Sequence, residues 1–252
     1  MRTINVESIA EGHEKVVKLI MTEDYHDVTT EDKEITFEHS EPVNIHIRHP
    51  GKPPFFSEAL QFGDKSMEAY ANEVLNVRKL VDRPGLPDFS YLYSSLIFDF
   101  PKGHYNTIRD GNGKLMRVDW QFGNGRRDGT NQIDYVVGKL ATSPTSRRCV
   151  VSLFEPAGHP VMDDPPCLNH IQFLLRNGEL NCHALFRSND MLSAWGGNAY
   201  ALMRLQEHVL GRINEVTSLQ TEMGWLETTS ISAHIYFKRD QFELDKFRKR
   251  WC

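Results

Sequence analysis

Three segments of the chain carry apolar residues at the three- and four-residue spacing of an amphipathic helix. They are residues 65–80, 131–140 and 198–210. In the second segment, Ile133 and Leu140 fall on one face together with the two valines between them. Such spacing places every apolar side chain of a segment against the same neighbour, so we expect three helices.

A second group of segments alternates apolar and polar residues or is rich in β-branched residues, which predicts strands. Asn-Gly at 177–178 separates two of them, and this dipeptide favours the tight turn of a β-hairpin. Helices and strands interleaved in this way predict an α+β fold with a mixed or antiparallel sheet flanked by helices. The expected strands are residues 44–49, 149–154, 170–175, 179–188 and 229–237.

The chain contains no internal repeat and no low-complexity linker. Its 252 residues suit one domain of ordinary size, so we expect a single domain over residues 1–252. Turn-rich sequence dominates residues 110–129. We therefore expect residues 102–129 to form a surface insertion.

Charge and composition exclude several classes of protein. Lys and Arg number 29 against 34 Asp and Glu, a net charge of −5, so non-specific nucleic-acid binding is not expected. No apolar run approaches the roughly 20 residues of a membrane span, and the N-terminus lacks a signal-peptide pattern. The four cysteines show no CxxC pairing, which favours reduced thiols and a cytoplasmic location. No metal-site motif is present, so we expect no metal.

Four local features carry reactive or anion-binding side chains. Cys167 follows Pro165-Pro166 at the start of a strand, although a lone cysteine is more often an inert core residue. Arg147 and Arg148 precede another strand, and alternation should send one of them to a packed or paired surface. The FRSND segment at 186–190 ends the hairpin, where it makes either an anion-binding corner or an ordinary turn. His234 and Tyr236 share one strand face, equally compatible with a site and with a solvent-facing edge.

Taken in order, these features resemble the folate-dependent thymidylate synthase family, in its archaeal-type branch. The resemblance covers residues 131–240 and rests on spacing. Arg147 precedes the Pro-Cys motif by twenty residues, Arg187 follows Cys167 by twenty, and Asn198 follows Arg187 by eleven. It implies that one sheet face forms the interface of a homodimer.

The resemblance also implies a role for each matching residue. Cys167 corresponds to the nucleophile that adds to C6 of the pyrimidine, and Arg187 lies close enough to lower the pKa of its thiol. Asn198 corresponds to the amide that reads O4 and N3–H of uracil. The remaining roles are Arg147 and Arg148 binding the phosphate of the partner subunit, Arg187 and Ser188 binding the nucleotide phosphate, Gln172 near base and phosphate, His234 and Tyr236 binding the sugar 3′-hydroxyl, and Asp190 contacting the pterin.

Some positions depart from the family pattern. Leu168 follows the cysteine, where many members carry His. For the general base we choose Glu73, with Glu68 second, and for the tyrosine that contacts the water network of the transfer either Tyr93 or Tyr91. The chain continues for only eighteen residues beyond His234, fewer than in well-known synthases, whose tail seals the site against water.

The function implied is conversion of dUMP to dTMP with methylene-tetrahydrofolate or a methanopterin analogue. The nearest alternative is a pyrimidine-nucleotide 5-hydroxymethylase with the same nucleophile, because a less sealed site admits water to the intermediate. A non-enzymatic alternative is a regulator that binds nucleotide or RNA. The net charge and the complete set of Cys, Arg, Ser and Asn side chains argue against that alternative.

Overall fold

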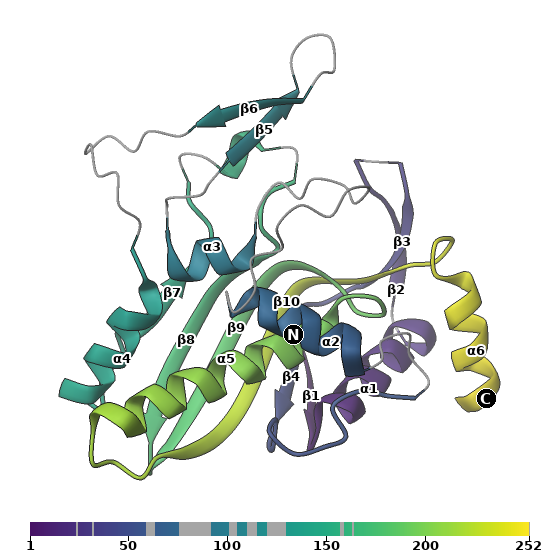
Figure 1. Ribbon diagram of the computed structural model, residues 1–252. Coiled ribbons are helices and arrows are strands. Elements are labelled where there is room, and N and C mark those ends of the chain that lie inside the picture. The colour runs from purple at the N-terminus through teal and green to yellow at the C-terminus, as the bar shows by residue number, and fades with distance from the viewer. Residues whose placement is uncertain are drawn as a thin grey trace.

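The computed structural model describes most of the chain. It covers residues 1–23, 25–31, 33–58, 64–75, 92–100, 105–109, 115–119, 130–156, 159–162 and 164–251. Its elements form one sheet, a layer of helices against that sheet, and a separate two-stranded hairpin (Figure 1).

Eight strands make a mixed sheet, as the sequence predicts. Two neighbouring pairs, β1 with β4 and β9 with β10, run parallel, and the other pairs run antiparallel. Its main path is β1 (Arg2–Val6), β4 (Val43–Ile47), β10 (Glu222–Tyr236), β9 (Glu179–Asp190), β8 (Leu168–Arg176) and β7 (Val150–Ser152). Farther along β10, β3 (Ile35–His39) joins its edge, and β2 (Tyr25–Thr29) pairs with β3.

A long central helix, α5 (Trp195–Val216), lies against β9 and β10 and contacts α1 (Ile9–Thr22), α2 (Asp64–Val74) and α4 (Gln132–Thr142). Figure 1 shows α5, α2 and α4 together in front of the sheet. Helices are confirmed within residues 65–80, over 131–140 and over 198–210, although residues 76–80 lie outside the described part. The other helices are α3 (Tyr93–Phe98), α6 (Gln241–Trp251) and a short 3-10 turn (His159–Val161).

Local sequence explains where several elements begin and turn. The side chain of Asn131 accepts hydrogen bonds from the backbone N–H groups of Ile133 and Asp134, and so caps the first turn of α4. Asn177 and Gly178 both adopt positive φ, at 53° and 82°, as the tight turn between β8 and β9 requires. The predicted hairpin is therefore confirmed.

The link between β9 and β10 places the ends of these strands side by side. Parallel strands cannot be joined by a tight turn, and here α5 makes the crossover. The register pairs Ser188 with Ser232 and Asp190 with His234. Two segments more than forty residues apart in the sequence thus meet at one place in the sheet.

The structure shows how exposed two sets of predicted residues are within one chain. Arg147 and Arg148 are both exposed, because β7 begins only at Val150 and strand alternation does not reach them. His234 is 7% exposed, which excludes the solvent-facing alternative for this side chain. Ile231, on the same strand, is 50% exposed. Alternation gives the two faces of a strand, but it does not show which of them the rest of the chain covers.

The turn-rich region contains a hairpin of its own. Strands β5 (Tyr105–Arg109) and β6 (Leu115–Asp119) pair antiparallel in a two-stranded sheet, separate from the main one. The rest of residues 102–129 lies outside the described part of the chain. That this region is a surface insertion, and that the chain is one domain, stay predictions.

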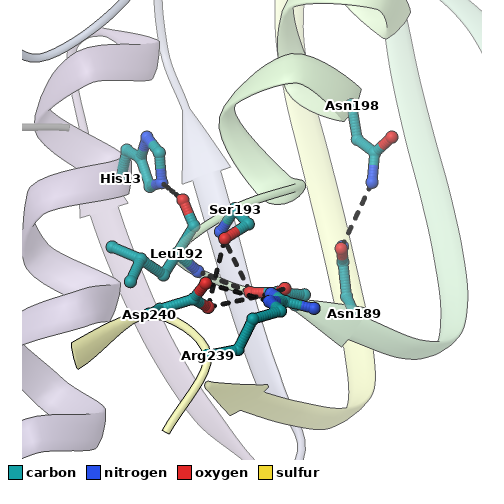
Figure 2. Close-up of polar contacts among 8 residues, drawn as sticks. His13, Asn189, Leu192, Ser193, Asn198, Arg239 and Asp240 are labelled. Atoms are coloured by element: carbon teal, nitrogen blue, oxygen red, sulfur yellow. Dashed lines mark hydrogen bonds and ion pairs between the residues drawn. The ribbon is translucent and has the colours of Figure 1, made fainter. Parts of the chain in front are cut away.

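His13 joins α1 to the turn that follows β9. Its side chain is 1% exposed, packs against Trp195 and bonds through Nε2 to the carbonyl oxygen of Leu192 at 3.0 Å (Figure 2). Burial lowers the pKa of the His13 imidazole to about 4, while hydrogen bonding to the backbone opposes this shift. The ring is therefore neutral in the folded protein at neutral pH and donates from Nε2.

We predict that His13 makes the fold sensitive to acid. An unfolded histidine binds its proton near pH 6.5 but the folded one only near pH 4, so stability is lost as pH falls between these values. The free energy of unfolding should fall by about 3 kcal/mol more in wild type than in His13→Gln between pH 7 and pH 4. Glutamine keeps a donor for Leu192 but cannot titrate in this range. Urea titrations of both proteins measure the difference, and parallel pH dependences would contradict the prediction.

Candidate active site

Cys167 stands immediately before β8, and Arg187 holds the backbone that leads to it. The Arg187 guanidinium donates from Nε to the carbonyl oxygen of Pro166 at 3.1 Å and from Nη2 to that of Pro165 at 2.6 Å. The Arg187 backbone N–H donates to the Cys167 carbonyl oxygen at 2.9 Å. Pairing of Leu168 with Phe186 in the hairpin sets this register. Strand pairing thus brings together two of the predicted residues that lie twenty positions apart.

Tyr93 holds the other side of the cysteine. Its hydroxyl, at the start of α3, accepts a hydrogen bond from the backbone N–H of Leu168 at 3.2 Å. The backbone of Cys167 is thus fixed from both sides, while its side chain stays partly exposed. A nucleophile held in place but accessible is what covalent catalysis requires.

Asn198, in the first turn of α5, is bonded at both ends of its amide. Its Oδ1 accepts from the Tyr70 hydroxyl at 2.7 Å, and its Nδ2 donates to Oδ1 of Asn189 at 3.2 Å (Figure 2 shows the second bond). Asn189 in turn donates to Oγ of Ser230 at 3.3 Å. Burial raises the pKa of the Tyr70 phenol well above its ordinary value, and Tyr93, Glu73 and Cys167 lie close enough to raise it further.

His234 and Tyr236 lie beside the end of β9. Their rings are 5.1 Å apart, nearly perpendicular. Burial lowers the pKa of the His234 imidazole, and nearby Asp190 partly opposes this effect. Burial also raises the pKa of the Tyr236 phenol, and among the further causes are the charges of Asp190 and Cys167. Cys167 therefore lies close to this group as well as to Tyr70.

Asp190 is already bonded to several groups of its own chain. Its Oδ1 accepts from the backbone N–H groups of Leu192 at 3.1 Å and Ser193 at 3.0 Å, and its Oδ2 pairs with Arg239. Arg239 also pairs with Asp240 at 2.8 Å. A carboxylate offers about four acceptor positions, so Asp190 can accept one more hydrogen bond.

Three predicted residues lie apart from the cluster of side chains around Cys167 described above. Gln172 donates from Nε2 to the carbonyl oxygen of Arg147 at 2.9 Å, and so fixes the loop before β7. The Arg147 and Arg148 side chains are exposed. Gln172 pairs across the hairpin with His183, four residues before Arg187 on β9. Within one chain, no described contact joins these three side chains to Cys167, and a role in a partner's site stays a prediction.

The two candidates for the general base are placed differently. Glu68 pairs with Arg204 at 2.7 Å and accepts from the Tyr200 hydroxyl at 2.8 Å on the outer side of the α2–α5 contact. Hydrogen bonds from Tyr200 and Arg204 lower the pKa of the Glu68 carboxyl and burial opposes them, so this carboxylate is occupied by a structural ion pair. Glu73 lies near Tyr70 instead. Tyr91 falls outside the described residues.

Three residues of the cluster were not predicted from the sequence to belong to the site. Tyr70 fitted the apolar face of a predicted helix, and nothing in its spacing pointed to its hydroxyl. Asn189 sat within a segment that also suits an ordinary turn. Arg239 lies in the charged stretch after the last strand. It pairs with Asp190 in a distant segment, and such a contact leaves no pattern in the local sequence.

Comparison with known proteins decides the family. A family model described as thymidylate synthase matches residues 95–247, more than half of the chain. The chain belongs to the thymidylate synthase family. The geometry agrees, because the residues that the family resemblance singles out around Cys167 are brought together by the β8–β9 hairpin and the β9–β10 pair.

Archaeal and viral proteins are among the relatives. A protein of Methanocaldococcus jannaschii named "Putative thymidylate synthase" is 29% identical over 252 residues, covering 98% of this chain and 96% of that protein. One of the same name from Methanosarcina acetivorans is 36% identical over 123 residues, 47% of this chain and 54% of its own length. The "Thymidylate synthase" of Varicella-zoster virus is 36% identical over 156 residues, 58% of this chain and 49% of its own. The last two matches thus span about half of those relatives.

Two kinds of feature are absent from the described residues. Within them, no helix has the length and apolar character needed to cross a membrane. Nor do three or more His, Cys, Asp or Glu side chains gather there as a metal site would need.

Thiol reactivity should distinguish Cys167 from Cys149 and Cys182. Burial raises the pKa of the Cys149 thiol and raises that of Cys182 much further, and both side chains are fully buried. Because the thiolate is the reacting form, iodoacetamide should modify Cys167 at least about tenfold faster than either of them. Peptide mass spectrometry after brief labelling measures the three rates, with guanidinium-unfolded protein as the control. Faster labelling of Cys149 or Cys182 would contradict this expectation.

Proposed function

We propose that the protein catalyses the reductive methylation of dUMP to dTMP at C5, with a methylene-tetrahydropterin as co-substrate. The observation that carries this proposal is the side-chain amide of Asn198, held close to the group that contains Cys167. An amide offers one acceptor and one donor, which match N3–H and O4 of uracil. A carboxylate, which suits cytosine, is not present at this position.

Cys167 is the nucleophile in this proposal. Its thiolate sulfur adds to C6 of the pyrimidine, and the electron pair of the C5–C6 bond moves into an enolate that includes O4. C5 thereby becomes a carbon nucleophile. Tyr93 and Arg187 support the step by fixing the backbone on both sides of Cys167. A lowered pKa of the Cys167 thiol through Arg187 stays a prediction.

In this proposal Arg187 and Ser188 bind the nucleotide phosphate. Two N–H groups of the Arg187 guanidinium are used by carbonyl oxygens, and a guanidinium has five, so three remain for phosphate oxygens. Exposed Arg147 and Arg148 would reach the phosphate site of a second subunit in a homodimer. His234 and Tyr236 would bind the sugar hydroxyl, and Gln172 would hold the arginine loop through the Arg147 carbonyl oxygen.

Asp190 fits a limited role toward the pterin. It retains about one acceptor position, enough for one N–H of the pterin ring. When bound, the pterin supplies the one-carbon unit and the hydride. Glu73 is the carboxylate that we place in proton transfer, because it lies near Tyr70 whereas Glu68 is held by Arg204. Folate or a methanopterin analogue would serve as carrier, and a cytoplasmic location stays a prediction.

Release of tritium from C5 of labelled dUMP tests the proposal. With methylene-tetrahydrofolate, tritium release and dihydrofolate absorbance should rise in step. Cys167→Ala should lower both by at least about a thousandfold, because no other group can form the C6 adduct, yet should retain dUMP binding. Cys182→Ala, a buried cysteine outside the cluster, is the matched control.

Each other outcome has its own meaning. Tritium release without dihydrofolate would show capture of the intermediate by water, and would replace the proposal with the 5-hydroxymethylase. Turnover retained in Cys167→Ala would overturn the nucleophile. If no C5 exchange occurs with folate, with a methanopterin carrier or with dCMP in place of dUMP, catalysis is excluded and a binding role remains.

Asn198→Asp should shift base preference toward cytosine. The carboxylate accepts from the exocyclic amino group of cytosine but repels O4 of uracil. We expect the ratio of dUMP to dCMP affinity to fall at least about a hundredfold, since a buried mismatch leaves polar groups unpaired. Titration calorimetry with both nucleotides measures this ratio. Asn131→Asp, an Asn-to-Asp change at the N-cap of α4, is the comparison, and an unchanged ratio in Asn198→Asp would contradict the role of Asn198.

A further inference from the structure

The Asn198 amide has two orientations of nearly the same shape, and they match different bases. With Oδ1 toward N3–H and Nδ2 toward O4, the amide matches uracil. Rotated by half a turn, it presents Nδ2 to N3 and Oδ1 to the exocyclic amino group of cytosine. Asparagine alone therefore does not select uracil, because the last torsion of its side chain is broad and roughly two-fold.

Two contacts within the chain break this symmetry. The Tyr70 hydroxyl lies 2.7 Å from Oδ1 of Asn198, and Nδ2 of Asn198 lies 3.2 Å from Oδ1 of Asn189. The phenol stays protonated, since burial raises its pKa well above the ordinary value. In the rotated amide the part-buried phenol would face an NH₂ group and its proton would lose its acceptor, a change that costs free energy.

We propose that Tyr70 is a positioning residue that selects uracil over cytosine by donating its hydroxyl proton to Oδ1 of Asn198. This inference rests on the proposed function and adds to it the group that sets base specificity. Each amide atom keeps capacity for the base: Oδ1 has a second lone pair and Nδ2 a second hydrogen. Asn189 supports the same orientation from the opposite end of the amide.

The chain offers a matched control on the same pair of helices. Tyr200 lies in α5 and donates its hydroxyl to Glu68 of α2, at 2.8 Å, on the outer side of the helix contact. Tyr70 lies in α2 and donates to Asn198 of α5. Changing either tyrosine to phenylalanine removes one hydroxyl from the same interface. Only Tyr70→Phe should alter the reading of the base.

The test is titration of dUMP and dCMP into wild type, Tyr70→Phe and Tyr200→Phe by calorimetry. We expect wild type to prefer dUMP, and Tyr70→Phe to lower the ratio of the two affinities about tenfold, the effect of one part-buried hydrogen bond. Tyr200→Phe should keep the wild-type ratio within twofold. Thermal melting of each variant checks its fold. A general loosening of the helix pair would weaken the binding of both nucleotides equally and leave the ratio of their affinities unchanged.

Failures of the two proposals can be told apart. If wild type binds neither nucleotide, the proposed function fails and this inference fails with it. If wild type prefers dUMP and Tyr70→Phe keeps that preference, only the inference is overturned. Should Tyr70→Phe not fold, Asn189→Ala removes the second contact and should lower the ratio in the same direction; an unchanged ratio there would overturn the inference.

Discussion

The parallel pairing of β9 with β10 is the constraint on which the site depends. Strands that run parallel need a crossover, and α5 provides it. This one connection brings three pairs of residues together. It places Asp190 beside His234, brings Ser188 beside Ser232, and starts α5 so that Asn198 lies within hydrogen-bonding distance of Asn189. The β8–β9 hairpin then adds Cys167 next to Arg187.

Local patterns in the sequence predicted the elements of this arrangement well. The helix at 131–140 and the hairpin around Asn177 and Gly178 depend on caps, turns and spacing within a few residues, and both are confirmed. The family, too, could be inferred from spacing, because the distances along the chain between Cys167, Arg187 and Asn198 are set by strand register and by the turn between β9 and α5. Where information is local or repeats a known spacing, the sequence is sufficient.

Contacts between distant segments could not be predicted from the sequence. The pairing of Asp190 with Arg239 joins residues 49 positions apart, and that of Tyr70 with Asn198 joins residues 128 apart. Neither leaves a periodic signal. Arg147 and Arg148 precede β7, so strand alternation does not indicate where their side chains point. Burial of His234 and exposure of Ile231 depend on what covers each part of β10, which no pattern within the strand records.

The residues of the site also hold the fold together, and this limits how each can be tested. Arg187 fixes the loop before Cys167, Asp190 binds the turn after β9 and Arg239, and Asn198 links α2 to β9. Each keeps unused donors or acceptors for a ligand. Groups that are already oriented before the substrate arrives need little rearrangement in the reaction, which is how preorganised polar sites gain catalytic power. Removing such a side chain therefore mixes structural and chemical effects. Changes that delete a single hydroxyl or replace an amide oxygen separate the two.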